Sequence, residues 1–117
     1  VLTELLLQRQ GIAPAQITGY NSTELTHAAV AAFVASGMAD VGLGVQTAAH
    51  RFGLHFIPLL KERYFFALPT EALARAEIRP VLAVLQSPAF VARVAALKGY
   101  EAAETGRVLS LAQAFEV

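Results

Sequence analysis

The residues best suited to hold a ligand lie close together in the first quarter of the chain. They are Tyr20, Asn21, Ser22 and Thr23, followed by Thr26 and His27. The first four come directly after a short β-prone segment and open a helix-compatible run. Backbone N–H groups at a helix start lack intrahelical partners, and with neighbouring hydroxyls they suit a small anion. This junction is therefore the candidate ligand site, with Thr26 and His27 as second contacts one turn further on.

The same residues also fit an ordinary structural role. Asn21 is a favoured N-cap residue, and Glu24 three positions later completes a capping-box pattern. A carboxylate in the first turn satisfies the helix dipole and repels an anion. For His27, a hydrogen-bonded structural histidine is the corresponding alternative. An anion-binding turn and a capped helix both stay open as interpretations.

Two glycines, Gly42 and Gly44, flank Leu43 in a second candidate region. The spacing is not that of a dinucleotide-binding loop, because the third glycine position is occupied by Thr47. The glycines instead favour a close backbone approach or a tight turn at the end of a short strand.

A charged run, Lys61-Glu62-Arg63, precedes Tyr64 between two predicted strands. It fits either a solvated turn or a hinge beside a cleft.

No pattern in the sequence calls for catalysis. There is no nucleophile–base arrangement and no carboxylate pair placed for acid–base work. The chain has no cysteine, and its three histidines, His27, His50 and His55, are not spaced as metal ligands. We therefore predict no enzyme activity, no catalytic residue, no metal site and no cofactor.

Composition narrows the class of protein. The 117 residues fit one domain, or one lobe of a larger one, and 56% of them are hydrophobic against 15% charged. A formal net charge of zero and scattered basic residues argue against direct nucleic-acid binding. No apolar run approaches the roughly 18 residues of a membrane span, so no membrane association is predicted.

The elements that position the candidate site alternate along the chain. Expected strands cover 17–20, 41–43, 55–60 and 64–68, and expected helices cover 2–10, 22–36, 45–52, 71–76, 81–86 and 89–97. Residues 12–15 are expected to be a connection. Gly37 is expected to close the helix at 22–36, and Ser87 to cap the helix at 89–97 with Pro88 at its first position. Residues 108–115 fit either state. On the helix at 22–36, one face is expected to pack on a sheet. It carries Leu25, Ala28, Ala29, Ala32 and Ser36. The pattern predicts an α/β fold with a mainly parallel sheet flanked by helices.

Several strings, in this order, resemble a known family. They are T-H-A-A-V-A-A-F-V-A-S-G-M-A-D-V-G-L-G-V, G-L-H-F-I-P-L-L-K-E-R-Y, S-P-A-F and G-Y-E-A-A-E-T-G. Together they resemble the periplasmic-binding-protein-like domain of bacterial regulators, a relative of type 2 solute-binding proteins. The resemblance covers nearly the whole chain.

The resemblance implies two α/β lobes around a cleft, joined by crossing strands. Residues 1–117 would form a single domain, the second lobe plus the return segment, with the first lobe apparently missing. Tyr20–Thr23, Thr26 and His27 would face the cleft. The hinge or cleft wall would hold Gly42, Gly44, Glu62, Arg63 and Tyr64. Without the first lobe, the surface that normally meets it would be exposed, so the chain is expected to form a homo-oligomer.

The resemblance also implies a function. We expect a non-catalytic sensing domain for a small molecule, an oxyanion such as molybdate, in a cytoplasmic transcriptional regulator. DNA would then be bound by an upstream helix-turn-helix domain. One alternative is a periplasmic receptor of a transporter, and another is a regulatory domain fused to a molybdopterin-biosynthesis enzyme.

Overall fold

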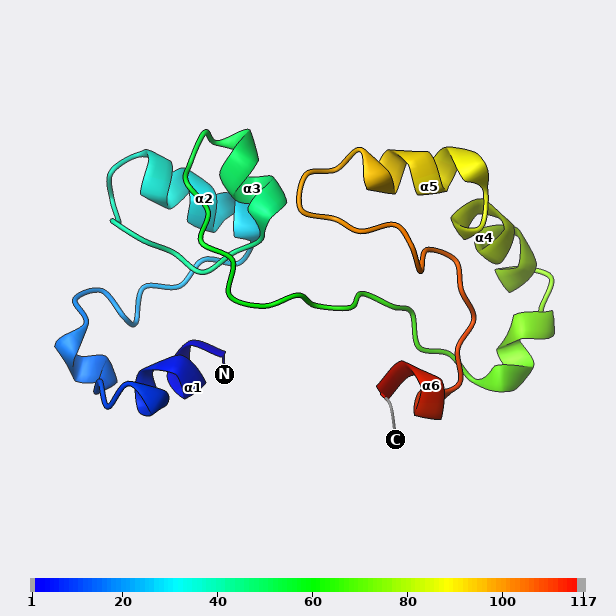
Figure 1. The fold of residues 1–117 in the computed structure, drawn as a ribbon, viewed down its shortest axis with the longest axis horizontal. Helices are drawn as coiled ribbons and strands as arrows, with labels where there is room; N and C mark the ends of the chain where they lie inside the picture. Colours follow the sequence, from blue (N-terminus) through cyan, green and yellow to red (C-terminus); the bar gives the residue numbers. More distant parts are fainter. Residues whose placement is uncertain (1, 116–117) are drawn as a thin grey trace. The chain divides into compact units, whose positions relative to one another are not determined.

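Short helices joined by irregular segments make up the structure, a computed structural model that describes residues 2–115 (Figure 1). The α-helices are α1 (Leu2–Arg9), α2 (His27–Ala35), α3 (Gln46–Arg51), α4 (Ile78–Leu85), α5 (Pro88–Ala95) and α6 (Leu111–Phe115). Two 3-10 helices, η1 (Pro14–Gln16) and η2 (Thr70–Ala74), complete the set. The chain divides into two compact units, Val1–Pro58 and Leu59–Val117.

The predicted α/β architecture is wrong, since residues 2–115 contain no β-strand and no sheet. Residues 17–20 form turns, whereas 41–43, 55–60 and 64–68 are non-helical and unpaired. A strand is stable only when a neighbour takes up its backbone N–H and C=O groups. In the described chain, none of these β-prone segments makes a ladder with another. Helices persist because their hydrogen bonds are local.

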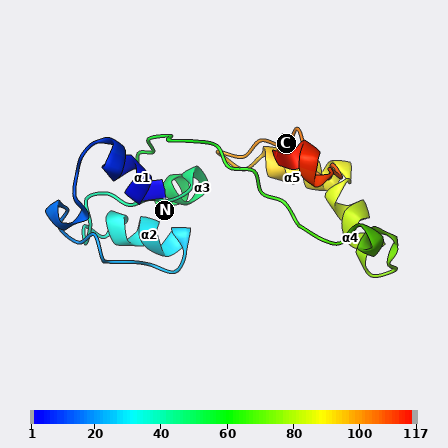
Figure 2. The same cartoon turned by 90° about the horizontal axis from the view of Figure 1, so that it is seen from below.

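In the first unit, α2 packs against α3, and Figure 2 shows the two side by side. The buried apolar side chains of these two helices are small ones, Ala31 of α2 and Ala48 of α3. Small residues let two helix backbones approach closely. The predicted core face of this helix is wrong: Leu25 precedes α2 and is fully exposed, and Ala28 is also exposed.

Helix α2 begins later than the sequence predicts. Its N-cap is Thr26, whose Oγ1 accepts a hydrogen bond from the Ala29 N–H at 3.0 Å. The predicted cap at Asn21 is therefore wrong. A threonine at this position satisfies one of the helix's unpaired donors as well as an asparagine would, and it lies directly against the apolar run.

The end of α2 is as predicted. Gly37 has a φ of 78°, a backbone conformation that residues with a Cβ rarely adopt. The Met38 N–H donates to Phe33 O at 3.2 Å and the Gly37 N–H to Val34 O at 3.0 Å. This pair of bonds is a Schellman motif, which ends the helix and satisfies two of its last carbonyls.

The second unit is built on α4, which packs against η2 and α5. Ala72 of η2 is buried there. The predicted start of α5 is confirmed: Ser87 is the N-cap, its Oγ accepts from the Phe90 N–H at 3.2 Å, and Pro88 takes the first helical position. The ambiguous segment near the C-terminus is helical over α6.

Within residues 2–115, no single helix is long and apolar enough to cross a membrane. Helices α4 and α5 meet that requirement only as a pair bent by 55°, and by length and composition alone.

Candidate functional site

A shallow open hollow of about 490 Å³ lies in the first unit, beside the predicted ligand site. Residues 14, 15, 17 and 19–22 line it. Tyr20, Asn21 and Ser22 thus meet at one surface, as the sequence analysis proposed for a site. Thr23 is not among the lining residues. Pro14 and Ala15 of η1 also line the hollow, although the sequence predicts only a connection there.

Backbone donors in this hollow are partly used by its own turns. The Tyr20 N–H donates to Ile17 O at 3.2 Å, and the Ser22 N–H donates to Gly19 O at 2.9 Å. Within residues 2–115, the N–H groups of Asn21 and Thr23 make no such bond. An anion in the hollow would therefore meet the Asn21 N–H and the side chains that line the hollow, rather than the open end of a helix.

Thr26 and His27 occupy the true start of α2. Thr26 is engaged as the cap, and His27 is the first helical residue. Gly44 lies against this histidine, since a methyl group built on Gly44 would sit 3.7 Å from His27 Nδ1. The structure therefore brings together two predicted site residues, His27 and Gly44, that are far apart in sequence.

Gly42 has a packing role. A Cβ at this position would lie 2.5 Å from Val30 Cγ1 and 3.3 Å from Val34 Cγ2, both on α2. The predicted close backbone approach is confirmed here, because only a residue without a side chain fits at that separation. The segment at 41–43 is thus held directly on the helix that carries His27.

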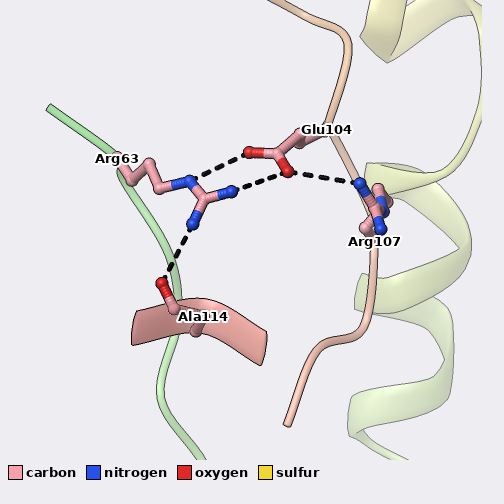
Figure 3. A network of polar contacts seen from close by, with 4 residues as sticks. All are labelled: Arg63, Glu104, Arg107 and Ala114. Atoms are coloured by element: carbon pink, nitrogen blue, oxygen red, sulfur yellow. Dashed lines mark hydrogen bonds and ion pairs between the residues drawn. The ribbon is translucent and has the colours of Figure 1, made fainter. Parts of the chain in front are cut away.

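The remaining predicted residues lie in the second unit. Arg63 is the centre of a polar network (Figure 3). Its Nε and Nη2 donate to the two oxygens of Glu104 at 3.0 and 2.8 Å, and its Nη1 donates to Ala114 O of α6 at 2.9 Å. Arg107 Nη1 also reaches Glu104, at 3.2 Å. The bidentate fork fixes the guanidinium more firmly than a single bond would.

Glu62 and Tyr64, on either side of Arg63, are exposed and take no part in this network. Lys61 pairs with Glu101 instead. Glu104 and Arg107 are not among the residues predicted from the sequence for the hinge or the site. The spacing of three residues between Glu104 and Arg107 indicates a local ion pair. It does not predict the contact with Arg63, which lies about forty positions earlier in the sequence.

Metal-ligating side chains do not gather anywhere in the described part of the chain: no group of three or more His, Asp or Glu residues could hold an ion.

Comparison with known proteins decides the family. The profile of the PBP superfamily domain matches residues 1–86, which include the hollow, α2 and the Arg63 segment. The chain belongs to the PBP superfamily. The resemblance to a periplasmic-binding-protein-like domain is thereby confirmed.

Two bacterial proteins are similar to the chain over most of its length. An uncharacterised Bacillus subtilis protein, YvgK, is 38% identical over 111 residues, or 93% of this chain and 35% of its own length. An uncharacterised Clostridium pasteurianum protein, from the 5′ region of a ferredoxin 2Fe-2S gene, is 31% identical over 94% of this chain and 98% of its own length. The chain thus spans about a third of the first relative and nearly all of the second. No solved structure matches it.

Proposed function

We propose that this PBP superfamily domain binds a small anion without transforming it, and that it serves as a sensing domain. The observation that carries the proposal is the family match over residues 1–86. The hollow lined by Tyr20, Asn21 and Ser22 adds a surface where small polar groups gather.

The local chemistry suits an anion of modest size. The Asn21 N–H and the Ser22 hydroxyl in the hollow, and the Thr23 hydroxyl next to them in the chain, are neutral donors, and the His27 imidazole can donate one more hydrogen bond. Glu24 opposes this attraction because its carboxylate lies in the same stretch of chain. The balance favours a compact, strongly hydrogen-bonding oxyanion, for which molybdate is the proposed ligand, over a large organic acid.

The biological setting follows as part of the same proposal. We place the domain in a cytoplasmic transcriptional regulator that contacts DNA through a helix-turn-helix domain. A periplasmic transport receptor, or a regulatory domain on a molybdopterin-biosynthesis enzyme, is the second candidate. The sequence of the complete gene product separates them, because the receptor requires a signal peptide and the regulator a helix-turn-helix.

Calorimetry on the complete gene product tests the ligand. Molybdate, tungstate, sulfate and phosphate are titrated into the parent and into Ser22→Ala, Thr23→Val and His27→Ala. Losing one hydrogen bond is worth about 0.5–1.5 kcal/mol, so each variant should weaken binding by about 2- to 12-fold.

Matched substitutions at exposed positions outside the site, Thr70→Val and His55→Ala, are expected to leave the affinity unchanged. If an anion binds and all three site variants bind it like the parent, the stretch 20–27 is not the site. If none of the four anions binds, the ligand class is wrong.

A further inference from the structure

Helix α6 is too short to be stable by itself. It has five residues, Leu111–Phe115, and none of them is buried. Isolated helices shorter than about 12 residues are marginal in water because the first turn is costly to form. The start of α6 is satisfied locally by a capping box: Ser110 Oγ accepts from the Gln113 N–H at 3.3 Å, and Gln113 Oε1 accepts from the Ser110 N–H at 2.9 Å. Its C-terminal end depends on residues from elsewhere in the chain.

Residues 63–65 supply the contacts at that end. Arg63 Nη1 donates to Ala114 O at 2.9 Å, across 51 positions of sequence. The Phe65 ring meets Phe115 edge to face, with centroids 5.6 Å apart. The last four carbonyls of a helix lack intrahelical partners, and a positive charge beside them also favours the negative end of the helix dipole. Arg63 therefore acts as a C-terminal cap of α6 from a distant part of the sequence.

Glu104 fixes the direction in which this arginine points (Figure 3). Arg63 Nε and Nη2 donate to its two carboxylate oxygens at 3.0 and 2.8 Å, which leaves Nη1 for Ala114 O. Because the guanidinium is planar and rigid, holding two nitrogens determines where the third one points. Arg107 holds the carboxylate in turn, with Nη1 3.2 Å from Glu104 Oε1. The side chains of Arg63 and Glu104 are 47% and 43% exposed, so water and dissolved ions reach the pair.

We propose that Arg63 and Glu104 form a salt-sensitive latch for α6: Glu104 positions Arg63, Arg63 caps the helix, and screening of the pair releases α6 from residues 63–65. The screening length falls from about 10 Å at 0.1 M salt to about 3 Å at 1 M. A part-exposed ion pair contributes little free energy, and α6 has no buried residue to add more. Ionic strength therefore shifts the fraction of α6 that is docked. The packing of α4 against η2 and α5 is expected to persist when α6 is released.

Amide hydrogen exchange, measured by NMR on the full chain, tests the latch. The reporter in α6 is the Ala114 N–H, which donates to Ser110 O at 2.9 Å. The Ala96 N–H at the end of α5, which donates to Ala92 O at 3.1 Å, is the internal reference. Raising the salt from about 0.05 to about 1 M should speed exchange at Ala114 about 2- to 5-fold relative to Ala96. The Cα chemical shifts of α6 should move toward coil values over the same range.

Variants separate the latch from a general effect of salt. Glu104→Gln keeps the shape of the side chain but removes its charge, so it should release α6 at low salt and remove most of the salt dependence. Arg63→Lys keeps the positive charge but lacks the planar fork, so it should also release α6. Glu62→Gln is the matched control, because it makes the same change at an exposed residue next to Arg63 and should behave like the parent.

Three results would each overturn the proposal. The first is exchange at Ala114 that rises with salt no more than exchange at Ala96 does. The second is a Glu104→Gln protein whose α6 chemical shifts and salt response match those of Glu62→Gln. The third is equal acceleration at Ala114 and Ala96 in Glu104→Gln, since that would mean that the whole unit is destabilised rather than α6 alone.

Discussion

Adding a single methyl group at Gly42 tests how the 41–43 segment is held on α2. In Gly42→Ala the new Cβ would sit 2.5 Å from Val30 Cγ1, about an ångström closer than van der Waals contact allows. Valine in a helix is confined largely to one χ1 rotamer, so its methyl group cannot simply turn away. The segment or the helix must therefore shift.

The magnitude follows from two opposing effects. Overpacking of this kind costs about 1–3 kcal/mol, whereas replacing glycine by alanine stiffens the unfolded chain and returns about 0.4–1 kcal/mol. We expect a net loss of about 1–2 kcal/mol in the free energy of unfolding. Gly44→Ala is the matched control: its nearest contact, 3.7 Å from His27 Nδ1, is ordinary, so stability should be unchanged or slightly higher.

Urea unfolding followed by circular dichroism measures both variants, with stability taken from the midpoint and slope. The double variant Gly42→Ala/Val30→Ala isolates the contact. Removing the valine methyl groups relieves the overlap, so the double variant should be less destabilised than the sum of the two single changes. Additive losses, or a Gly42→Ala protein as stable as Gly44→Ala, would refute the close approach.

Two further outcomes follow from the same structure. Thr26→Ala should lower the free energy of unfolding by about 1 kcal/mol through loss of the α2 cap, whereas Asn21→Ala should leave it unchanged. The opposite result in urea unfolding would indicate that the helix begins near Asn21. Arg63→Met should cost about 0.5–1 kcal/mol at low salt and much less near 1 M salt, because the ion pair with Glu104 is partly exposed; a loss independent of salt would point to packing instead.

Local features were predictable from the sequence because they depend on a few neighbouring residues. The Ser87-Pro88 start of α5 and the Gly37 end of α2 were read correctly from residue type alone. The prediction of Asn21 as the α2 cap is wrong because Asn21 and Glu24 also fit a capping-box pattern, which suits a helix that starts earlier. Thr26 is a suitable cap residue too, and residue type alone does not tell where the helix begins.

The prediction of a β-sheet is wrong for a different reason. Strand propensity in 55–60 and 64–68 reports how well side chains fit a pleated surface, not whether a partner strand is present. Strand pairing requires contacts between residues that are distant in sequence, and residue types alone do not predict such contacts. The Arg63–Glu104 contact, across about forty residues, could not be predicted for the same reason. The family itself was recognisable because its signature is a string of residue types, which does not depend on how the strands pair.

Binding of an anion at the 20–23 turn is the central claim, and one titration tests it most directly. Calorimetry of the complete gene product with molybdate should show saturable binding that Ser22→Ala weakens by about 2- to 12-fold and Thr70→Val does not change. Binding of equal strength in the parent and Ser22→Ala, or no heat of binding with any of molybdate, tungstate, sulfate and phosphate, would contradict it.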